Sequence, residues 1–382
     1  MNDLELSLRD SMVRAAERAP HTPSTLAYQV ETLYRRRWQH RRTLIAAVAV
    51  IVAGIAAGVP SLGPATTAVQ RATAVEPIEQ VWPQAIKKVP ASAVKGNLIA
   101  KLDDHTLLLE TWSQTKQLDY LYTYDIDTDA THEIVDVTRQ GSHKFPPGYV
   151  VGDGHIVWWY VTQERLELVT APLTGGEQRV FATLDRRDMT GAGDMIDELA
   201  VVAGKVVFSL EKGGVYTVHL AGGTVEPVPQ ADGMHLLRWP WVGTSNRYSD
   251  PRTDVLFKDM LNVKTGERST AVVHPGDQYV KCAVTRCTGV KADGQPFSRL
   301  RDGSQETDLP TGAVSLTPQL MDRFHVEDNI VLRDLSTGAE ADLGMPAGQA
   351  TYRFYPTRSQ HRSLLAYQVK DEVVLVDLTK IP

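Results

Sequence analysis

The sequence predicts an all-β fold, a seven-bladed β-propeller, that follows a short helical segment and one transmembrane helix. Three observations predict it. Residues 43–62 form one uncharged apolar stretch, and from about residue 96 onward the apolar runs have strand length. A hairpin turn of similar composition then recurs every 35 to 47 residues. Such a period is typical of a four-stranded propeller blade.

The apolar stretch 43–62 divides the chain. Twenty helical residues span roughly 30 Å, about the thickness of the hydrocarbon core of a bilayer. Five arginines precede the stretch, namely Arg35, Arg36, Arg37, Arg41 and Arg42, and the next charged residue after it is Arg71. Because positive charge stays on the cytoplasmic side, we expect residues 1–42 in the cytoplasm and the rest of the chain outside.

Two other interpretations of this stretch remain open. A buried helix of a soluble protein is one, although it would rarely run so far without a polar residue. A cleaved signal peptide is the other, with Thr66-Thr67-Ala68 as a small-residue cleavage site. A leader of 42 residues is too long for the usual charged region of a signal peptide, so we favour an uncleaved signal-anchor.

Charge is distributed unequally between the two sides. The whole chain of 382 residues has a net charge of −6, but residues 1–42 hold eight Arg and five Asp or Glu. The remainder therefore holds 32 basic and 41 acidic residues, a net charge of −9. A basic segment suits the anionic inner leaflet of a membrane. An acidic domain is a poor partner for nucleic acid, and we predict no nucleic-acid binding.

Residues 1–42 are expected to form two amphipathic helices. The first begins at Asn2, whose side chain would cap it, and ends at Pro20. The second restarts at Thr22-Pro23 and carries an apolar stripe formed by Leu26, Val30, Leu33, Tyr34 and Trp38. Two such short helices bury little against each other, so this stripe is predicted to face the membrane surface or a cytoplasmic partner.

Only two cysteines are present, Cys282 and Cys287, and both lie in the part expected outside the cell. No His or carboxylate flanks them as a further zinc ligand. In an oxidising compartment we expect a local disulfide that joins two strands or pins a hairpin, with free buried thiols as the alternative.

Residues 63–95 are rich in Pro, Ala, Thr and Val and are predicted to be an extended linker, although 81–90 could already belong to the outer domain. The recurring turn then appears seven times, at residues 124–129, 171–176, 218–223, 261–266, 300–303, 333–338 and 376–379. Glycine suits these turns because a tight hairpin needs a residue with positive φ. Seven turns predict seven blades, with six as an alternative because the fifth unit is irregular. The last unit stops after its turn, so the stretch before residue 97 is expected to supply its missing outer strand.

No motif for chemistry stands out. The sequence has no G-x-S-x-G and no H-E-x-x-H, and its eleven histidines are scattered. We predict no catalytic residue, no cofactor and no metal site. Arg238, Trp239 and Trp241 lie near the start of a blade and are candidates for a ligand mouth, with packing between blades as the alternative. Consecutive Trp158, Trp159 and Tyr160 would point to alternate faces of one strand and pack between blades.

Taken together, these features resemble a group of actinobacterial single-pass membrane proteins. The segments that match are MNDLELSLRDSMVRAAERAP, RRRWQHRR with the apolar helix after it, the repeated turns and the Cys282-x4-Cys287 pair. Such proteins end in a TolB-type or WD-repeat-like propeller. They are often encoded beside extracytoplasmic-function sigma factors, so the resemblance implies a membrane-bound sensor or an anti-sigma-like regulator. Zinc-type anti-sigma domains use a His and Cys set that His21 and His40 do not supply.

The predicted organisation is therefore a cytoplasmic helical segment at 1–42, a transmembrane helix at 43–62, a linker at 63–95 and an extracytoplasmic propeller at 96–382. The predicted function is non-enzymatic binding of an extracytoplasmic ligand or protein, with a sigma factor as a cytoplasmic partner. An envelope scaffold is the first alternative. A hydrolase or lyase with its site in the propeller funnel is the second.

Overall fold

The structure is a computed structural model that describes residues 75–94, 96–111, 118–138, 148–162, 165–185, 195–244, 252–310, 319–327, 330–345 and 363–382. All of these lie within one compact unit, Thr73–Pro382. In this part of the chain, no helix has both the length and the apolar character that crossing a bilayer requires. The predictions for residues 1–62, which include the apolar stripe, the arginines and the transmembrane helix, lie outside the described residues.

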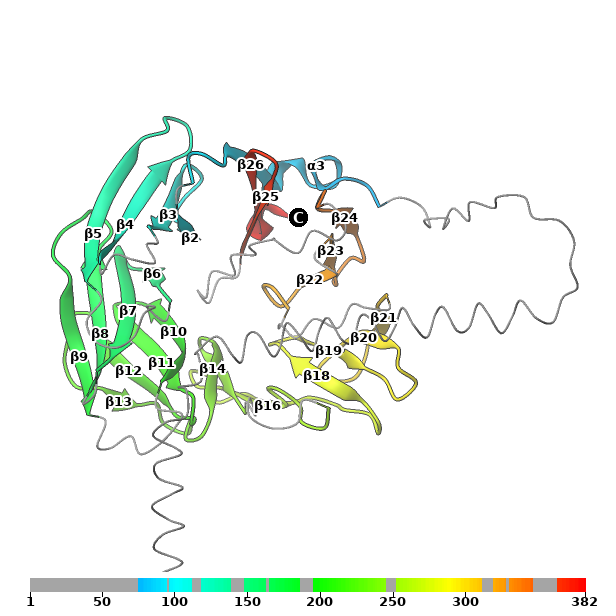
Figure 1. Cartoon of the computed structure of the whole chain (residues 1–382). Coiled ribbons are helices and arrows are strands. Elements are labelled where there is room, and N and C mark those ends of the chain that lie inside the picture. Colours follow the sequence, from blue (N-terminus) through cyan, green and yellow to red (C-terminus); the bar gives the residue numbers. More distant parts are fainter. Residues whose placement is uncertain are drawn as a thin grey trace, which may run out of the picture. The chain divides into compact units, whose positions relative to one another are not determined.

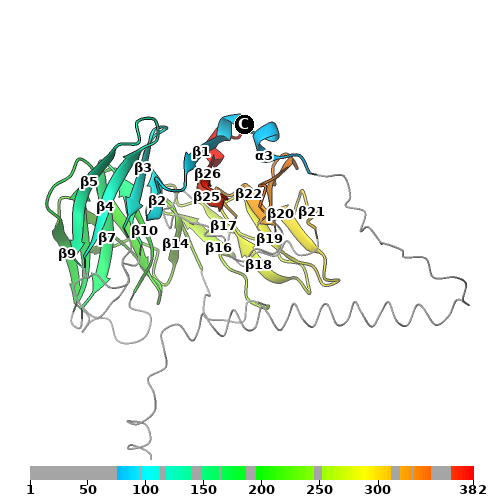
Figure 2. The ribbon, with the colours of Figure 1, turned by 45° about the horizontal axis from the view of Figure 1, so that its top comes forward.

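The described strands form seven antiparallel sheets that follow one another around a ring (Figure 1). The fold is thus the predicted all-β, seven-bladed propeller, and the six-bladed alternative is wrong. A view turned by 45° shows the blades side by side along the ring (Figure 2). Helix is scarce among the described residues and is confined to α3 (Ile78–Val81) and the short 3₁₀ turns η1 (Pro83–Ala85) and η3 (Leu378–Lys380).

Each of the first five sheets has four strands that pair in chain order. The first contains β2 (Asn97–Lys101), β3 (Thr106–Glu110), β4 (Leu118–Asp125) and β5 (Thr131–Thr138). The second contains β6 (Val150–Gly152), β7 (His155–Val161), β8 (Arg165–Pro172) and β9 (Arg179–Asp185). The third contains β10 (Ile196–Val202), β11 (Lys205–Leu210), β12 (Val215–His219) and β13 (Glu226–Pro227).

The fourth sheet contains β14 (His235–Arg238), β15 (Trp241–Gly243), β16 (Asp259–Asn262) and β17 (Arg268–Thr270). The fifth contains β18 (Gln278–Cys282), β19 (Arg286–Val290), β20 (Pro296–Leu300) and β21 (Thr307–Asp308). The sixth is described as β22 (Phe324–Glu327), β23 (Val331–Asp334) and β24 (Glu340–Asp342). The seventh is described as β25 (Leu364–Val369), β26 (Glu372–Asp377) and β1 (Ile86–Pro90).

The core lies between blades, where neighbouring sheets pack their apolar side chains into shared clusters. In β7 every residue after His155 is buried, which explains a continuous apolar run instead of strict alternation. Trp158 and Tyr160 pack in a cluster shared with the first blade, whereas Trp159 packs in a cluster shared with the third. The predicted division of these three aromatic side chains between two faces is confirmed.

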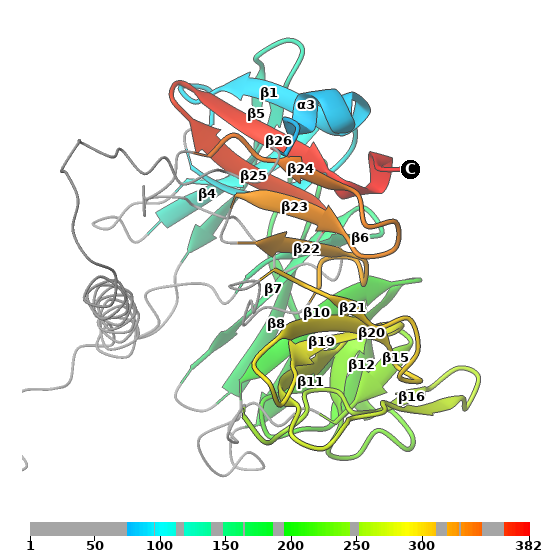
Figure 3. The ribbon, with the colours of Figure 1, turned by 90° about the vertical axis from the view of Figure 1, so that its right-hand side faces the viewer.

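Strand β1 closes the ring. It comes from the N-terminal side of the unit and pairs antiparallel with β26, near the C-terminus, from Ile86 opposite Val376 to Pro90 opposite Glu372. Figure 3 shows β1 beside β26 and β25, and β24, β23 and β22 next to them. The segment before residue 97 thus supplies the outer strand of the seventh blade, as predicted. The expected domain start at residue 96 falls after this strand.

The segment that leads into β1 is itself anchored. Asp342 N donates to Glu76 O at 2.8 Å, so the chain before α3 is held against β24 of the sixth blade. Ile78 and Trp82 are 0% and 5% exposed in a cluster with apolar residues of the sixth and seventh blades. Burying a side chain such as Ile78 contributes roughly 1.5–3 kcal/mol. Residues 76–90 therefore join two neighbouring blades.

The seven recurring turns lie where the sequence places them, each directly before the outermost strand position of a blade. Several begin with a side-chain cap: Asp125 accepts from Thr128 N at 2.8 Å, Asn262 from Lys264 N at 3.0 Å and Asp334 from Ser336 N at 2.9 Å. Gly266 has a φ of +75°, a conformation that side chains with a Cβ rarely adopt. The turn at Asp377 has the same cap, and β1 takes the place of the strand that would follow.

The two cysteines form the expected disulfide. Cys282 and Cys287 are cross-strand partners at the hairpin of β18 and β19, with their Cα atoms 4.0 Å apart. Both are buried in a cluster shared by the fourth and fifth blades, together with Phe257 and Phe297. The bond therefore pins a hairpin inside the core.

An ion-pair network joins the last blade to the first. Lys101 Nζ lies 2.6 Å from both Asp104 Oδ1 and Asp377 Oδ2, and Lys380 Nζ lies 2.8 Å from Asp104 Oδ1. Hydrogen bonds from Lys101 and Lys380 hold the pKa of Asp104 well below its usual range. Burial alone would raise the pKa of Asp377, but hydrogen bonds from Lys101 and Thr379 outweigh burial and lower it.

Because these carboxyl pKa values are lowered by folding, the pairs should stabilise the ring at neutral pH and fail in acid. Their contribution is complete above the unfolded-state pKa, about 4, and is lost as the pH falls through the lower folded values. We expect Asp377→Asn to cost about 1 kcal/mol at pH 7 and to lose less further stability than the wild type between pH 5 and pH 3. Urea unfolding followed by tryptophan fluorescence measures both values.

The exposed Asp232 provides the control for this prediction. Asp232→Asn should leave both the stability at pH 7 and the acid loss as they are in the wild type. An Asp377→Asn variant with the same acid loss as the wild type would show that the Lys101 network does not stabilise the closed ring.

Candidate binding groove between the second and third blades

A groove runs along the outer rim between the second and third blades. The outer strands of the two blades differ in length: β9 has seven residues, and β13 has only two. The cavity measures about 620 Å³, within the range of small-molecule and peptide sites.

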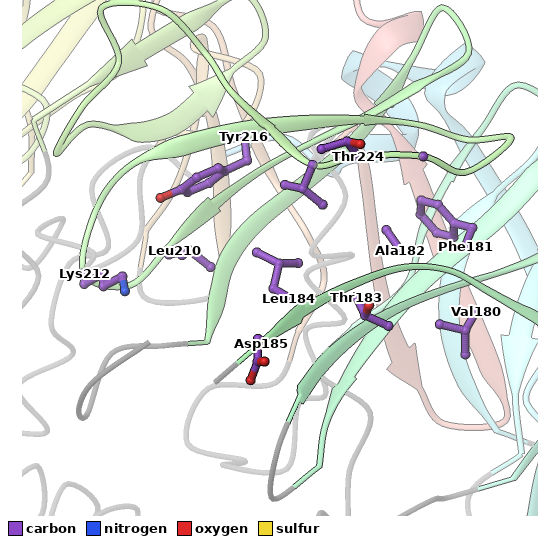
Figure 4. A pocket seen from close by; sticks show the side chains of 12 residues that line it. Val180, Phe181, Ala182, Thr183, Leu184, Asp185, Leu210, Lys212, Tyr216 and Thr224 are labelled. Atoms are coloured by element: carbon purple, nitrogen blue, oxygen red, sulfur yellow. The ribbon is translucent and has the colours of Figure 1, made fainter. Parts of the chain in front are cut away.

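The lining comes from three segments (Figure 4). Strand β9 supplies one wall. Leu210 at the end of β11, Lys212 in the turn after it and Tyr216 of β12 supply a second, and residues 223–225 supply the third. Figure 4 shows Leu184 and Leu210 facing the space between the walls. It also shows Val180 and Phe181 toward one end of β9 and Asp185 at the other. The lining residues are Val180, Phe181, Ala182, Thr183, Leu184, Asp185, Leu210, Lys212, Tyr216, Gly223, Thr224 and Val225.

One end of the groove is closed by contacts between the blades. Arg179 Nη2 donates to Leu220 O at 2.7 Å, and Nη1 donates to Ala221 O at 3.2 Å. At Gly222, whose φ is +106°, an added Cβ would lie 3.2 Å from Phe181 O. The small residue and the arginine together hold the start of β9 against the turn 220–223, so the groove opens only beyond this point.

The floor of the groove is a rigid part of the core. The rings of Phe208 and Tyr216 stack with centroids 5.6 Å apart and an interplanar angle of 23°. Leu210, Phe181 and Ala182 belong to the buried cluster between the two blades, and Leu184 packs at its edge. The groove is thus a continuation of the core to the surface and needs no rearrangement to exist.

Strand β9 presents two faces of different character. Its pairing with β8 shifts register at Phe181, so Phe181 and Ala182 are both buried while Val180, Thr183 and Asp185 are exposed. Val180 is 47% exposed, which is unusual for a large apolar residue on a strand. The groove and Val180 together form an apolar surface at an accessible sheet edge, a feature that is typical of interaction sites.

The chemistry of the lining favours binding. Asp185 and Lys212 are its charged side chains, and both have partners within the chain. Within the described ranges, no three His, Cys, Asp or Glu side chains gather as a metal site would require. The lining is mainly apolar, with one acidic and one basic side chain.

One Ser, Asp and His group occurs elsewhere and bears on the hydrolase alternative. His235 Nδ1 lies 2.7 Å from Asp197 Oδ2, and Ser209 Oγ donates to the other oxygen of Asp197. The aspartate thus lies between the other two, and the hydroxyl also accepts from Leu236 N at 3.0 Å. A hydrolytic triad needs the base on the nucleophile. This buried group instead connects the third blade to the fourth.

The three residues predicted to form a ligand mouth have different environments in the structure. Arg238 is exposed at the end of β14, but Trp239 and Trp241 are only partly exposed and pack on the clusters on either side of the fourth blade. Burial raises the pKa of Asp322, and the hydrogen bonds from Thr285 and the charge of Arg238 oppose that rise. Arg238 is therefore the exposed member of the three, while the two tryptophans join inter-blade packing. A ligand mouth at these residues stays a prediction.

Neither family models nor curated proteins match this chain. Solved structures do resemble it. A structure described as YCF48 bound to D1 peptide is 10% identical, with a TM-score of 0.45, and the match covers 81% of this chain and 99% of that one. A prolyl endopeptidase is 13% identical, with a TM-score of 0.43, and the match covers 76% and 47%.

TolB from Acinetobacter baumannii is 11% identical, with a TM-score of 0.34, and the match covers 73% of this chain and 65% of that one.

Proposed function

We propose that this chain is a membrane-anchored, non-enzymatic binding protein whose propeller lies outside the cytoplasm and captures a protein partner. The observation that supports binding is the groove between β9 and β12, which exposes apolar surface on a rigid floor. A seven-bladed ring is a suitable scaffold for it, because the packed core holds the walls of the groove in place without a ligand.

The proposed location rests on the uncharged stretch 43–62 and the five arginines before it. A disulfide within the propeller suits an oxidising compartment, where such bonds persist. In the proposed arrangement residues 1–42 remain in the cytoplasm, and their apolar stripe is the surface for a cytoplasmic partner such as a sigma factor. The protein would then act as a sensor or an anti-sigma-like regulator.

The groove predicts which residue matters for partner binding. With full-length protein immobilised and solubilised envelope proteins as the source, Val180→Glu should reduce the amount of retained partner at least tenfold. Val180 is an exposed apolar residue of the lining, so a partner that covers it would bury the new carboxylate without giving it a partner. Quantitative mass spectrometry of the retained proteins measures the effect.

The matched control is Val272→Glu. Val272 is 41% exposed, close to the 47% of Val180, but it lies after β17 and outside the groove. A partner retained by the wild type and by Val272→Glu but lost from Val180→Glu supports the proposal. Equal retention by Val180→Glu and the wild type would remove the groove as the binding site.

The topology can be tested independently of any partner. In intact cells, protease added from outside should digest the propeller and spare residues 1–42, and a reporter fused after Pro382 should be active only outside. Thiol labelling of denatured, unreduced protein should find Cys282 and Cys287 blocked. A reporter active only in the cytoplasm, or two free thiols in mature protein, would contradict the proposed location.

The cytoplasmic surface predicts a separate loss of binding. The double change Leu26→Asp and Leu33→Asp puts two charges on the apolar stripe and should abolish recovery of a sigma factor with the full-length protein. Glu31→Gln, outside the stripe, should leave recovery intact. Persistent recovery with both aspartates present would reject this docking surface.

A further inference from the structure

The outer edges of the seven blades are not equally protected. Five of the outermost described strands, β1, β13, β17, β21 and β24, have five residues or fewer. Short length limits pairing with another chain. Strand β1 adds two lysines and Pro90, and β13 adds Pro227. Strand β5 has eight residues but carries His132, Glu133 and Asp136 along its edge.

Strand β9 is the exception. It has seven residues, and the five from Val180 to Leu184 include neither a charge nor a proline. An edge strand directs a row of main-chain N–H and C=O groups away from its sheet, and in the described sheets β9 pairs only with β8. The residue types that usually block strand addition are missing from this edge.

The groove lies beside this same edge. A strand added to β9 would place every second side chain on the face that carries Ala182 and Leu184, above the groove. On the opposite wall those side chains would meet Tyr216 and Val225. The remaining side chains would lie on the face of Thr183 and Val180, where the added strand would cover part of the exposed Val180. Main-chain pairing and alternate apolar pockets are the two components of recognition by strand addition.

Charge restricts the occupant. The lining from Val180 to Leu184 and from Gly223 to Val225 is uncharged, and the two charges present, Asp185 and Lys212, are opposite in sign. A groove of this kind does not attract phosphates or a highly charged peptide, since neither finds a complementary charge. Charge complementarity favours an extended segment whose inward side chains are uncharged and apolar.

We infer that β9 accepts an extended segment of a partner protein as a fifth strand of the second blade, with alternate apolar side chains in the groove. This inference rests on the proposed function and specifies its mode of binding. The main-chain groups of β9 supply the affinity. The groove selects apolar side chains at alternate positions, because Ala182, Leu184 and Val225 in its lining are apolar.

The test uses full-length protein and a defined probe. The probe is a fluorescein-labelled peptide of alternating Thr and Val with a Lys at each end, and binding is followed by fluorescence anisotropy. We expect the wild type and Val272→Glu to bind it, and Val180→Glu to bind at least tenfold more weakly. Thr183→Pro should also bind at least tenfold more weakly, since it removes an edge donor without adding charge to the groove, and edge strands tolerate proline.

A second probe keeps the inference falsifiable should the proline variant not fold. The same peptide, N-methylated at alternate residues, cannot donate along one edge and should bind the wild type at least tenfold more weakly than the unmodified peptide. If Val180→Glu weakens binding but N-methylation and Thr183→Pro do not, the groove is the site and strand addition is wrong. If Val180→Glu changes neither probe binding nor partner retention, the proposed function itself fails.

Other occupants give different results. One combination of results would show that β9 pairs with a second copy of this chain. In it the full-length protein sediments as a dimer, Val180→Glu makes it monomeric, and the probe does not bind. That combination overturns the inference. If removal of residues 1–72 is required before the probe binds, the N-terminal segment of the same chain occupies the edge, which also overturns it. A wild-type protein that shows no probe binding under any of these conditions rejects strand addition by a partner.

Discussion

Apolar packing between neighbouring blades is the interaction on which the rest of this structure depends. A blade such as the second has β7 buried on both faces, so it is not stable without the blades on either side. A linear array of such sheets would expose two apolar faces at its ends. The ring removes both ends, and the pairing of β1 with β26 fixes it as a closed unit.

The repeated elements could be predicted from the sequence because local chemistry determines them. A tight turn favours a capping Asp or Asn and a residue that accepts positive φ. A capping Asp or Asn occurs in five of the seven turns, and a residue with positive φ occurs in six. The division of Trp158 and Trp159 between two clusters follows from the strand period of two. The disulfide and the missing outer strand could also be predicted from the sequence. The two cysteines are close in sequence, and the missing strand follows from a count of the strands.

The groove could not be predicted in this way. Its lining comes from β9, from Leu210, Lys212 and Tyr216 and from residues 223–225, which lie together only when the second and third blades pack. The Lys101 network depends on residues such as Asp377 that are adjacent only after the ring closes. Trp239 and Trp241 are residues that the sequence suggested for a ligand mouth. In the structure they pack mainly between blades. Sequence patterns indicate local structure, whereas contacts between distant blades need the assembled ring.

The closing strand has a mechanical consequence. Residues 76–90 are both the entry of the chain into the propeller and the last strand of its final sheet, so any pull from the N-terminal side acts on the seam that seals the ring. Such a force would load the five backbone pairs between β1 and β26. The buried side chains of Ile78 and Trp82 would resist before that seam is loaded.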